Sequence, residues 1–283
     1  MLARVDRVQV VVADRAAAVA HFSRLLGAEL ARQDMVRALG AKRTVVHLGA
    51  STVELLEPDG SGPTDDFMRT TGGGLFAAGV ATEDPSALRA RLRTHGVECL
   101  EAGPQLFVPN ASPGLHLIVS QLAVHAPVGL ARHLYEVTNL VPDFAGAAAR
   151  LTAACGLNDR NFVPIRSAEF GYDGTLTLFD PDRLDRIEII TPTDVAKTMG
   201  RFFTKRGACL YMCYIEADDL RPIRTRLLEH APHDWTGARE TQQLDNLFIH
   251  PRALGGVMIG VSRTTYGWTW SGHPERVVAE ASQ

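Results

Sequence analysis

The sequence contains two diverged copies of one segment. Val-Glu-Leu-Leu-Glu-Pro at 53–58 returns as Ile-Glu-Ile-Ile-Thr-Pro at 187–192, and the segment 84–95 returns at 219–230. Gln-Leu-Phe-Val-Pro at 105–109 likewise returns as Asn-Leu-Phe-Ile-His-Pro at 246–251. A chain that repeats at a fixed period is built from copies of one folding unit. We therefore predict two modules, 3–124 and 129–264, followed by a tail over 265–283.

Each module divides again into two similar halves. Apolar residues alternate along 7–12, which is the period of a half-buried strand, and Asp14 and Gly27 delimit an amphipathic helix. Strand patterns follow over 44–48 and 52–57, and the second half repeats the order with a strand at 75–81, a helix at 85–95 and strands at 105–109 and 115–121. The pattern predicts an α+β fold of four βαβββ units, whose curved sheets form two concave cups.

Composition excludes several classes of partner. The 283 residues carry a net charge of −3, which gives no attraction to nucleic acid or to an anionic membrane surface. No apolar run approaches the roughly 18 residues that span a bilayer, and no signal peptide is visible at the start. The four scattered cysteines are expected to be free thiols, as in the cytoplasm. We expect a cytoplasmic monomer or homodimer that binds a small molecule.

The motifs resemble those of the vicinal oxygen chelate superfamily, also known as the glyoxalase-like proteins. The resemblance lies in the two Glu-strand motifs, in the strand and helix around 75–95 and 210–230, and in the closing His-Pro…Gly-Gly-Val segment at 250–257. That superfamily includes glyoxalase I, methylmalonyl-CoA epimerase, extradiol dioxygenases and metal-free antibiotic-binding proteins. It implies two tandem glyoxalase-like modules, and it does not by itself fix the function.

The resemblance also implies up to four metal ligands in each cup. The corresponding positions are Arg7, Glu54, Phe76 or Ala77, and Ile118 in the first module, and His133, Glu188, Tyr211 or Met212, and Gly260 in the second. Arginine cannot ligate a metal, and a divalent ion needs at least three N or O donors. No cofactor is therefore expected. If a divalent metal is bound, His133 and Glu188 are the residues expected to hold it.

The two cups differ in the chemistry they offer. In the first, Arg7 and Glu54 form either a structural ion pair or an anchor for an anionic substrate, and His116 faces the same cup. In the second, His133 and Glu188 are predicted to be a proton-transferring pair, with a relict hydrogen-bonded pair as the alternative. Tyr135 is expected on the His133 face. The facing strand adds Met212, Tyr214 and Glu216 as substrate-binding residues.

Three functions remain open from the sequence. The first is an isomerase, epimerase or lyase that moves a proton next to a carbonyl of a small organic substrate. The second is a metal-free protein that binds or sequesters a ligand, and the third is a metal-dependent ring-cleaving dioxygenase. The aromatic tail segment Trp-Thr-Trp at 268–270 is expected to cover a cup mouth or a dimer surface.

Overall fold

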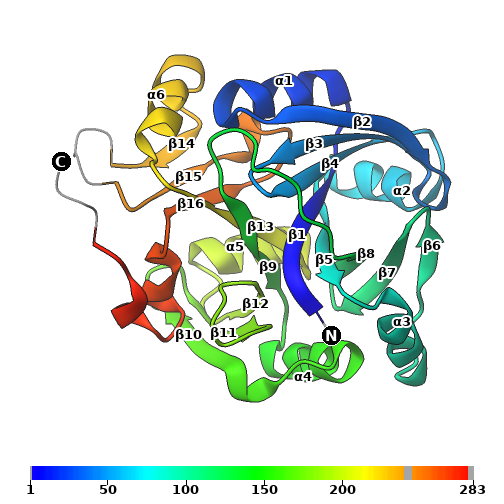
Figure 1. The fold of residues 1–283 in the computed structure, drawn as a ribbon. Helices are drawn as coiled ribbons and strands as arrows, with labels where there is room; N and C mark the ends of the chain where they lie inside the picture. Colours follow the sequence, from blue (N-terminus) through cyan, green and yellow to red (C-terminus); the bar gives the residue numbers. More distant parts are fainter. Residues whose placement is uncertain (1, 239–243, 280–283) are drawn as a thin grey trace.

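The computed structural model describes residues 2–238 and 244–279. Its strands form two mixed sheets of eight strands each (Figure 1). The first sheet has the order β2-β3-β4-β1-β5-β8-β7-β6 and the second the equivalent order β10-β11-β12-β9-β13-β16-β15-β14. The predicted α+β fold of four βαβββ units in two tandem modules is confirmed.

The strands of the first sheet are β1 (Leu2–Val11), β2 (Glu29–Val36), β3 (Ala41–Leu48), β4 (Ser51–Pro58), β5 (Gly74–Thr82), β6 (Leu100–Ala102), β7 (Gln105–Ser112) and β8 (Leu115–Gln121). Those of the second sheet are β9 (His133–Leu140), β10 (Phe162–Ser167), β11 (Tyr172–Leu178), β12 (Arg186–Pro192), β13 (Cys209–Ala217), β14 (Trp235–Gly237), β15 (Asn246–Ile249) and β16 (Ile259–Arg263).

Four of the helices follow the first strand of a βαβββ unit: α1 (Arg15–Leu26), α3 (Pro85–Thr94), α4 (Phe144–Cys155) and α6 (Arg221–His230). The α1 helix begins as its sequence predicts, because the side chain of Asp14 accepts a hydrogen bond from the Ala17 amide, and it ends at Gly27 in the left-handed region. Two further helices, α2 (Gly62–Thr71) and α5 (Thr198–Arg206), connect the units within each module and were not anticipated. None of the described helices is long and apolar enough to cross a membrane.

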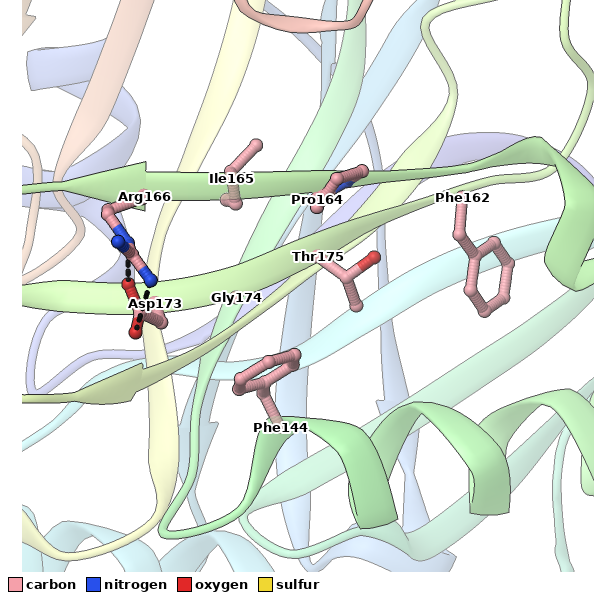
Figure 2. A pocket seen from close by; sticks show the side chains of 8 residues that line it. All are labelled: Phe144, Phe162, Pro164, Ile165, Arg166, Asp173, Gly174 and Thr175. Atoms are coloured by element: carbon pink, nitrogen blue, oxygen red, sulfur yellow. Dashed lines mark hydrogen bonds and ion pairs between the residues drawn. The ribbon is translucent and has the colours of Figure 1, made fainter.

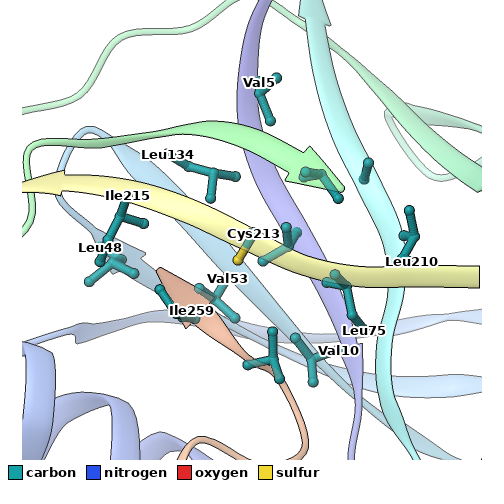
Figure 3. Packing of buried hydrophobic residues seen from close by; sticks show 14 of the residues in the cluster. Val5, Val10, Leu48, Val53, Leu75, Leu134, Leu210, Cys213, Ile215 and Ile259 are labelled. Carbon is teal, nitrogen blue, oxygen red and sulfur yellow. The ribbon is translucent and has the colours of Figure 1, made fainter. Parts of the chain in front are cut away.

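Both modules share one hydrophobic core. Buried side chains of the first module, among them Val5, Val10 and Val53, pack with side chains of the second such as Cys213 and Ile259 (Figure 3). The α1 helix packs against α6, and α3 packs against α4, so the helices also join the modules (Figure 1). All four cysteines are free. The two cups have apolar clusters of their own, separate from this shared core.

Bulges recur at equivalent places in the two sheets. The pairing of β1 with β5 skips Asp6 and Phe76, and the pairing of β9 with β13 skips Tyr135 and Tyr211. Each bulge moves the following residues to the other face of the sheet, because side chains alternate along a strand. The bulges therefore decide which side chains face the cups.

Candidate active site in the second cup

The strand register identifies the equivalent positions of the two cups. Gln9 lies beside Glu54, and Thr138 lies beside Glu188 in the same way. Arg7 pairs with Gly79 across β1 and β5, and its equivalent Glu136 pairs with Tyr214. The expectation that His133 is equivalent to Arg7 is therefore wrong. His133 pairs with Glu216 and corresponds to Arg4, which pairs with Ala81.

A polar network fills the first cup around Glu54, which is fully buried. Its carboxylate accepts hydrogen bonds from Arg7 Nη1 (2.9 Å), Gln9 Nε2 (2.8 Å), Arg43 Nη1 (3.1 Å) and Gln105 Nε2 (2.8 Å). Burial alone would raise the pKa of Glu54, but the two arginines and the two amides outweigh it and hold the pKa below its ordinary value. The Arg7–Glu54 ion pair expected from the sequence is present.

The rest of the first cup is closed by aromatic packing. His116 faces the same cup, as expected, and its ring lies 5.1 Å from that of Phe76 and 5.5 Å from that of Phe107. Its Nδ1 accepts a hydrogen bond from the Asn110 amide, and burial lowers its pKa. Both oxygens of Glu54 are thus engaged within the protein, and the unpaired Gln9 Oε1 of this network is itself buried, so the described residues direct no ionisable group of this network at a ligand.

The second cup holds a cavity of about 630 Å³. Two buried carboxylates, Glu136 and Glu188, lie among its lining residues, with Thr138 next to both on the strand surface, and the exposed Glu169 lies at its rim. Most of the remaining lining is aromatic or contains a thioether: Phe170, Tyr172, Met199, Tyr211, Met212, Tyr214, Phe248, Met258 and Trp270. Of the predicted substrate-binding residues, Met212 and Tyr214 lie here. The aromatic tail also lies at this cup, where Trp270 contacts the ring of Tyr214 at 5.7 Å.

Glu188 is held in a protonated state by its surroundings. Its pKa is raised to about 8, first by burial and then by the negative charge of Glu136, while the hydrogen bond from Thr138 and the charge of Arg186 oppose the shift. The Thr138 hydroxyl donates to Oε2 at 2.5 Å. Among the described residues no group is hydrogen-bonded to Oε1, so this oxygen is available to a ligand in the cavity.

Glu136 is neutralised by an arginine behind it. Arg186 is fully buried, donates to Glu136 Oε2 through Nε at 2.6 Å, and stacks on the ring of Tyr135 at 5.1 Å. Burial raises the pKa of Glu136, while Arg186 and a hydrogen bond from Trp270 oppose that shift. In the first cup the positions equivalent to Glu136 and Arg186 hold Arg7 and Thr52. A cation therefore stands there in place of the Glu136 carboxylate, and an uncharged residue stands in place of Arg186.

The expected His133–Glu188 pair is not formed. Thr138, not His133, lies beside Glu188, and His133 is five residues away at the start of β9. Its Nε2 lies 3.8 Å from Glu216 Oε2, and burial together with Arg132, Arg4 and Arg183 lowers its pKa to about 4.

Two other predicted cup residues also lie outside the cavity. The hydroxyl of Tyr135 is hydrogen-bonded to Ser262 Oγ at 3.0 Å in a buried cluster with Leu184 and Trp268. Glu216 accepts a hydrogen bond from the Thr265 amide. The Tyr135 bulge explains these errors, since it turns Glu136 and Thr138 toward the cavity in place of the residues that strict alternation selects.

One substitution between the modules explains why only the second cup is open. Arg43 fills the first cup from β3, opposite Leu56, and the equivalent position on β11 is Gly174, opposite Ile190. A Cβ at Gly174 would lie 2.7 Å from Ile190 Cγ2, so Ile190 occupies the space beside the glycine and leaves no room there for a longer side chain. Two residues away along the strand, Tyr172 replaces the small Ala41 and contributes its ring to the cavity.

The donors of the second cup do not fit a divalent metal ion. At the level of Glu188 the four inner strands present Thr138, Glu188, Met212 and Met258, which is one carboxylate with a hydroxyl and two thioethers. Hard divalent ions need several oxygen or nitrogen ligands. Within 2–238 and 244–279, no three His, Cys, Asp or Glu residues are grouped so that they could hold a metal.

A second depression, of about 470 Å³, lies between α4 and the strands β10 and β11 (Figure 2), and it shares Pro164, Ile165 and Arg166 with the cavity of the second cup. Phe144 of α4 lies below Thr175, with Phe162 at one end and the ion pair of Arg166 Nε and Asp173 Oδ1 (2.6 Å) at the other. Its charged groups are engaged with each other and exposed. It therefore lacks the convergent polar groups of an active site.

Comparison with known proteins agrees with the fold. Residues 6–107 match the model of the Glyoxalase/Bleomycin resistance protein/Dioxygenase superfamily, and no curated protein matches the sequence. A triple variant of 4-hydroxymandelate synthase from Streptomyces coelicolor has a similar structure, with 15% identity, a TM-score of 0.69, and coverage of 92% of this chain and 93% of that one. The predicted resemblance to the superfamily is thus confirmed, and at this identity the likeness concerns the fold alone.

Single-module enzymes match about half of the chain. Methylmalonyl-CoA epimerase from Mycobacterium tuberculosis has 23% identity, a TM-score of 0.39, and coverage of 47% of this chain and 89% of its own. A methylmalonyl-CoA epimerase in complex with methylmalonyl-CoA and NH₄⁺ has 21% identity, a TM-score of 0.39, and coverage of 45% of this chain and 100% of its own.

Proposed function

We propose, for this tandem chain whose N-terminal module matches the glyoxalase/bleomycin resistance protein/dioxygenase superfamily, that the second cup is an enzyme active site. Its reaction moves a proton at a carbon next to a carbonyl of a small organic molecule, as in isomerases, epimerases and lyases. The observation that carries the proposal is the position of Glu188, a carboxyl group with a pKa of about 8 and a free oxygen at the wall of a 630 Å³ cavity. A general acid–base group works best when its pKa lies near the working pH.

Glu188 acts as the base in its ionised form. Its carboxylate takes the proton from the carbon, the electrons of the C–H bond move into the carbonyl, and an enolate with a protonated Glu188 results. Return of the Glu188 proton to another atom of the enolate completes an isomerisation, and a proton delivered by water to the opposite face, with Glu188 losing its own proton to solvent, completes an epimerisation. Thr138 holds Oε2 throughout, so that Oε1 carries the proton.

Tyrosine hydroxyls are suited to stabilise the enolate oxygen. Tyr172, Tyr211 and Tyr214 all line the cavity, and burial raises the pKa of each, so the phenols keep their protons at neutral pH. A protonated phenol donates a hydrogen bond to a developing oxyanion, which is worth several kcal/mol in a site protected from water.

A metal-free ligand-binding protein is the second candidate, and the mainly apolar lining of the cavity favours it. A ring-cleaving dioxygenase is disfavoured, because its chemistry needs ligands that Thr138, Met212 and Met258 cannot supply. A small organic molecule is the partner in both remaining readings. We place the protein in the cytoplasm, where the free thiols of Cys99, Cys155, Cys209 and Cys213 persist; monomer or homodimer stays a prediction.

The test is deuterium exchange at the carbon next to the carbonyl, followed by NMR in D₂O over a set of small ketones. Glu188→Gln should lose roughly 10²–10⁴ of the rate and keep its binding affinity. Glu169→Gln is the matched control, because Glu169 lines the same cavity but is exposed at its rim. The wild-type rate should rise with pH up to about 8 and then level, as Glu188 ionises. Binding of a ketone without exchange would favour the ligand-binding protein.

A further inference from the structure

We infer that the second cup selects an uncharged substrate that carries an aromatic ring, and that it rejects carboxylates. This rests on the proposed function in one respect, because it takes the second cup to be the place where the substrate binds. The argument depends on three features of the described lining: its charges, its rings and the position of the free oxygen of its buried acid Glu188.

The described lining offers an anion no available cation. It contains three glutamates, Glu136, Glu169 and Glu188, and one arginine, Arg166. Arg166 is exposed at the rim, where its Nε is bonded to Asp173 Oδ1 at 2.6 Å. Arg186 is the nearest buried cation, but it lies behind Glu136 and is occupied by that carboxylate.

The consequence for a bound carboxylate is a large penalty. A carboxylate that enters the cavity loses its hydration, lies close to Glu136 and Glu188, and gains no interaction with an opposite charge among the described lining residues. A neutral molecule avoids this cost. With Glu188 protonated and Glu136 paired with Arg186, the interior of the cup is close to electrically neutral at pH 7.

The rings of the lining are arranged as a cage. Tyr214 is at its centre, with the rings of Phe248 at 5.8 Å in an edge arrangement and Trp270 at 5.7 Å. Tyr211, Tyr172 and Phe170 add three more rings, and Met199, Met212 and Met258 add polarisable thioethers. Such walls favour a flat aromatic ligand over a saturated one of the same size, because ring–ring and sulfur–ring contacts add to burial.

A carbonyl oxygen finds hydrogen-bond donors beside these rings, namely the phenols of Tyr172, Tyr211 and Tyr214 and the protonated Glu188. Glu188 Oε1 is the free carboxyl oxygen beside this cage, and in its protonated form it donates a hydrogen bond to a carbonyl oxygen. An aryl ketone therefore satisfies both the rings and the acid. The cavity volume of about 630 Å³ suits a ligand with one or two rings.

Three probes of one shape test this selectivity on the wild-type protein by isothermal titration calorimetry at pH 7. They are 4-phenylbutan-2-one, its keto-acid analogue 2-oxo-4-phenylbutanoate, and 4-cyclohexylbutan-2-one. The aryl ketone should bind at least about 30-fold more tightly than the keto acid, which pays for an unpaired charge. It should bind about 3- to 10-fold more tightly than the cyclohexyl ketone, which loses the ring contacts.

Two matched variants locate the binding site. Phe248→Ala removes a ring of the cage, whereas Phe162→Ala removes an equally half-buried ring of the depression in Figure 2. Affinity for the aryl ketone should fall about 10-fold in the first variant and by less than about 2-fold in the second. Melting temperatures of both variants identify any loss that is due to unfolding.

The outcomes separate this inference from the proposed function. Keto-acid binding equal to or tighter than that of the aryl ketone overturns the inference, as does an unchanged affinity in the folded Phe248→Ala protein. Selective binding of the aryl ketone without exchange of its protons supports the inference and removes the proposed reaction. Proton exchange together with preferential binding of the keto acid supports the proposed reaction and overturns the inference.

Discussion

Glu54 and Glu188 occupy the same position in their two modules but differ in their partners. Two arginines and two amides surround Glu54, whereas Glu188 has one hydroxyl partner and a second carboxylate nearby. One environment lowers the pKa of its glutamate and the other raises it. The side chain is the same, so the neighbouring residues alone separate a glutamate with a lowered pKa from one with a raised pKa.

The raised pKa of Glu188 predicts a pH dependence of stability. Because the folded protein binds this proton more tightly than the unfolded chain, the stabilisation is complete below the ordinary value of 4.5 and is lost as pH rises to about 8. Glu188→Gln has no such proton. The melting temperature of Glu188→Gln minus that of the wild type should therefore increase between pH 4.5 and pH 8, measured by circular dichroism. A constant difference over this range would contradict the raised pKa.

Glu54 predicts the opposite sign. Its folded pKa is lowered, so its stabilisation is present above 4.5 and is lost as pH falls through the folded value. Glu54→Gln should cost up to about 3 kcal/mol at pH 7, since it removes the buried charge that Arg7 and Arg43 share and leaves them only the less buried Asp6 and Asp34. Urea titrations should show that this cost shrinks at acid pH. A cost below 1 kcal/mol at pH 7 would mean that the network contributes little.

At the scale of elements, the bulges limited what the sequence could predict. Period-two patterns predict the strands well, because Val8 and Val10 or Ile187 and Ile189 are buried on one side. The inserted Tyr135 and Tyr211 change the facing side in the middle of a strand, and no local signal marks them. Glu188 was therefore found from its motif, while Glu136, Thr138 and Tyr172 were not recognised as site residues. The Trp-rich tail was the one available signal for Trp270.

The 3-10 turn at Tyr266–Trp270 is predicted to act as a wall of the cup. Trp268 anchors the turn beneath Arg276, whose guanidinium lies 4.7 Å from the ring centre, while Trp270 lines the cavity. Trp270→Ala should weaken binding of 4-phenylbutan-2-one by about 10-fold, through loss of ring contacts and entry of water.

Tyr266→Ala is the control in the same turn, because its ring packs on Trp270 and does not line the cavity. Calorimetry should show a change of less than about 3-fold for this variant. Equal losses in both variants would show that the turn only supports the fold.

At the scale of the whole molecule, the two modules divide the tasks of the fold. The first cup is filled by charges and rings, and the second keeps a cavity, while one core runs through both. The duplication was readable in the sequence because the strand motifs persist in both copies. The shared core was not, since the packing of Val5 and Val53 against Cys213 and Ile259 depends on how the two sheets come together (Figure 3).

A shared core predicts that the chain unfolds as one unit, and the tryptophans allow this to be tested. All three, Trp235, Trp268 and Trp270, lie in the second half of the sequence, so their fluorescence reports on the second module only. Glu54→Gln alters the first module alone. It should nevertheless lower the midpoint of thermal unfolding by the same amount whether unfolding is followed by tryptophan fluorescence or by far-UV circular dichroism. The reason is that neither module keeps its core without the other. Arg89→Gln, which removes an exposed ion pair of the same module with Glu101, should move neither midpoint by more than a degree or so. A Glu54→Gln protein whose fluorescence transition stays at the wild-type temperature, while part of its circular dichroism signal melts earlier, would show that the modules are independent.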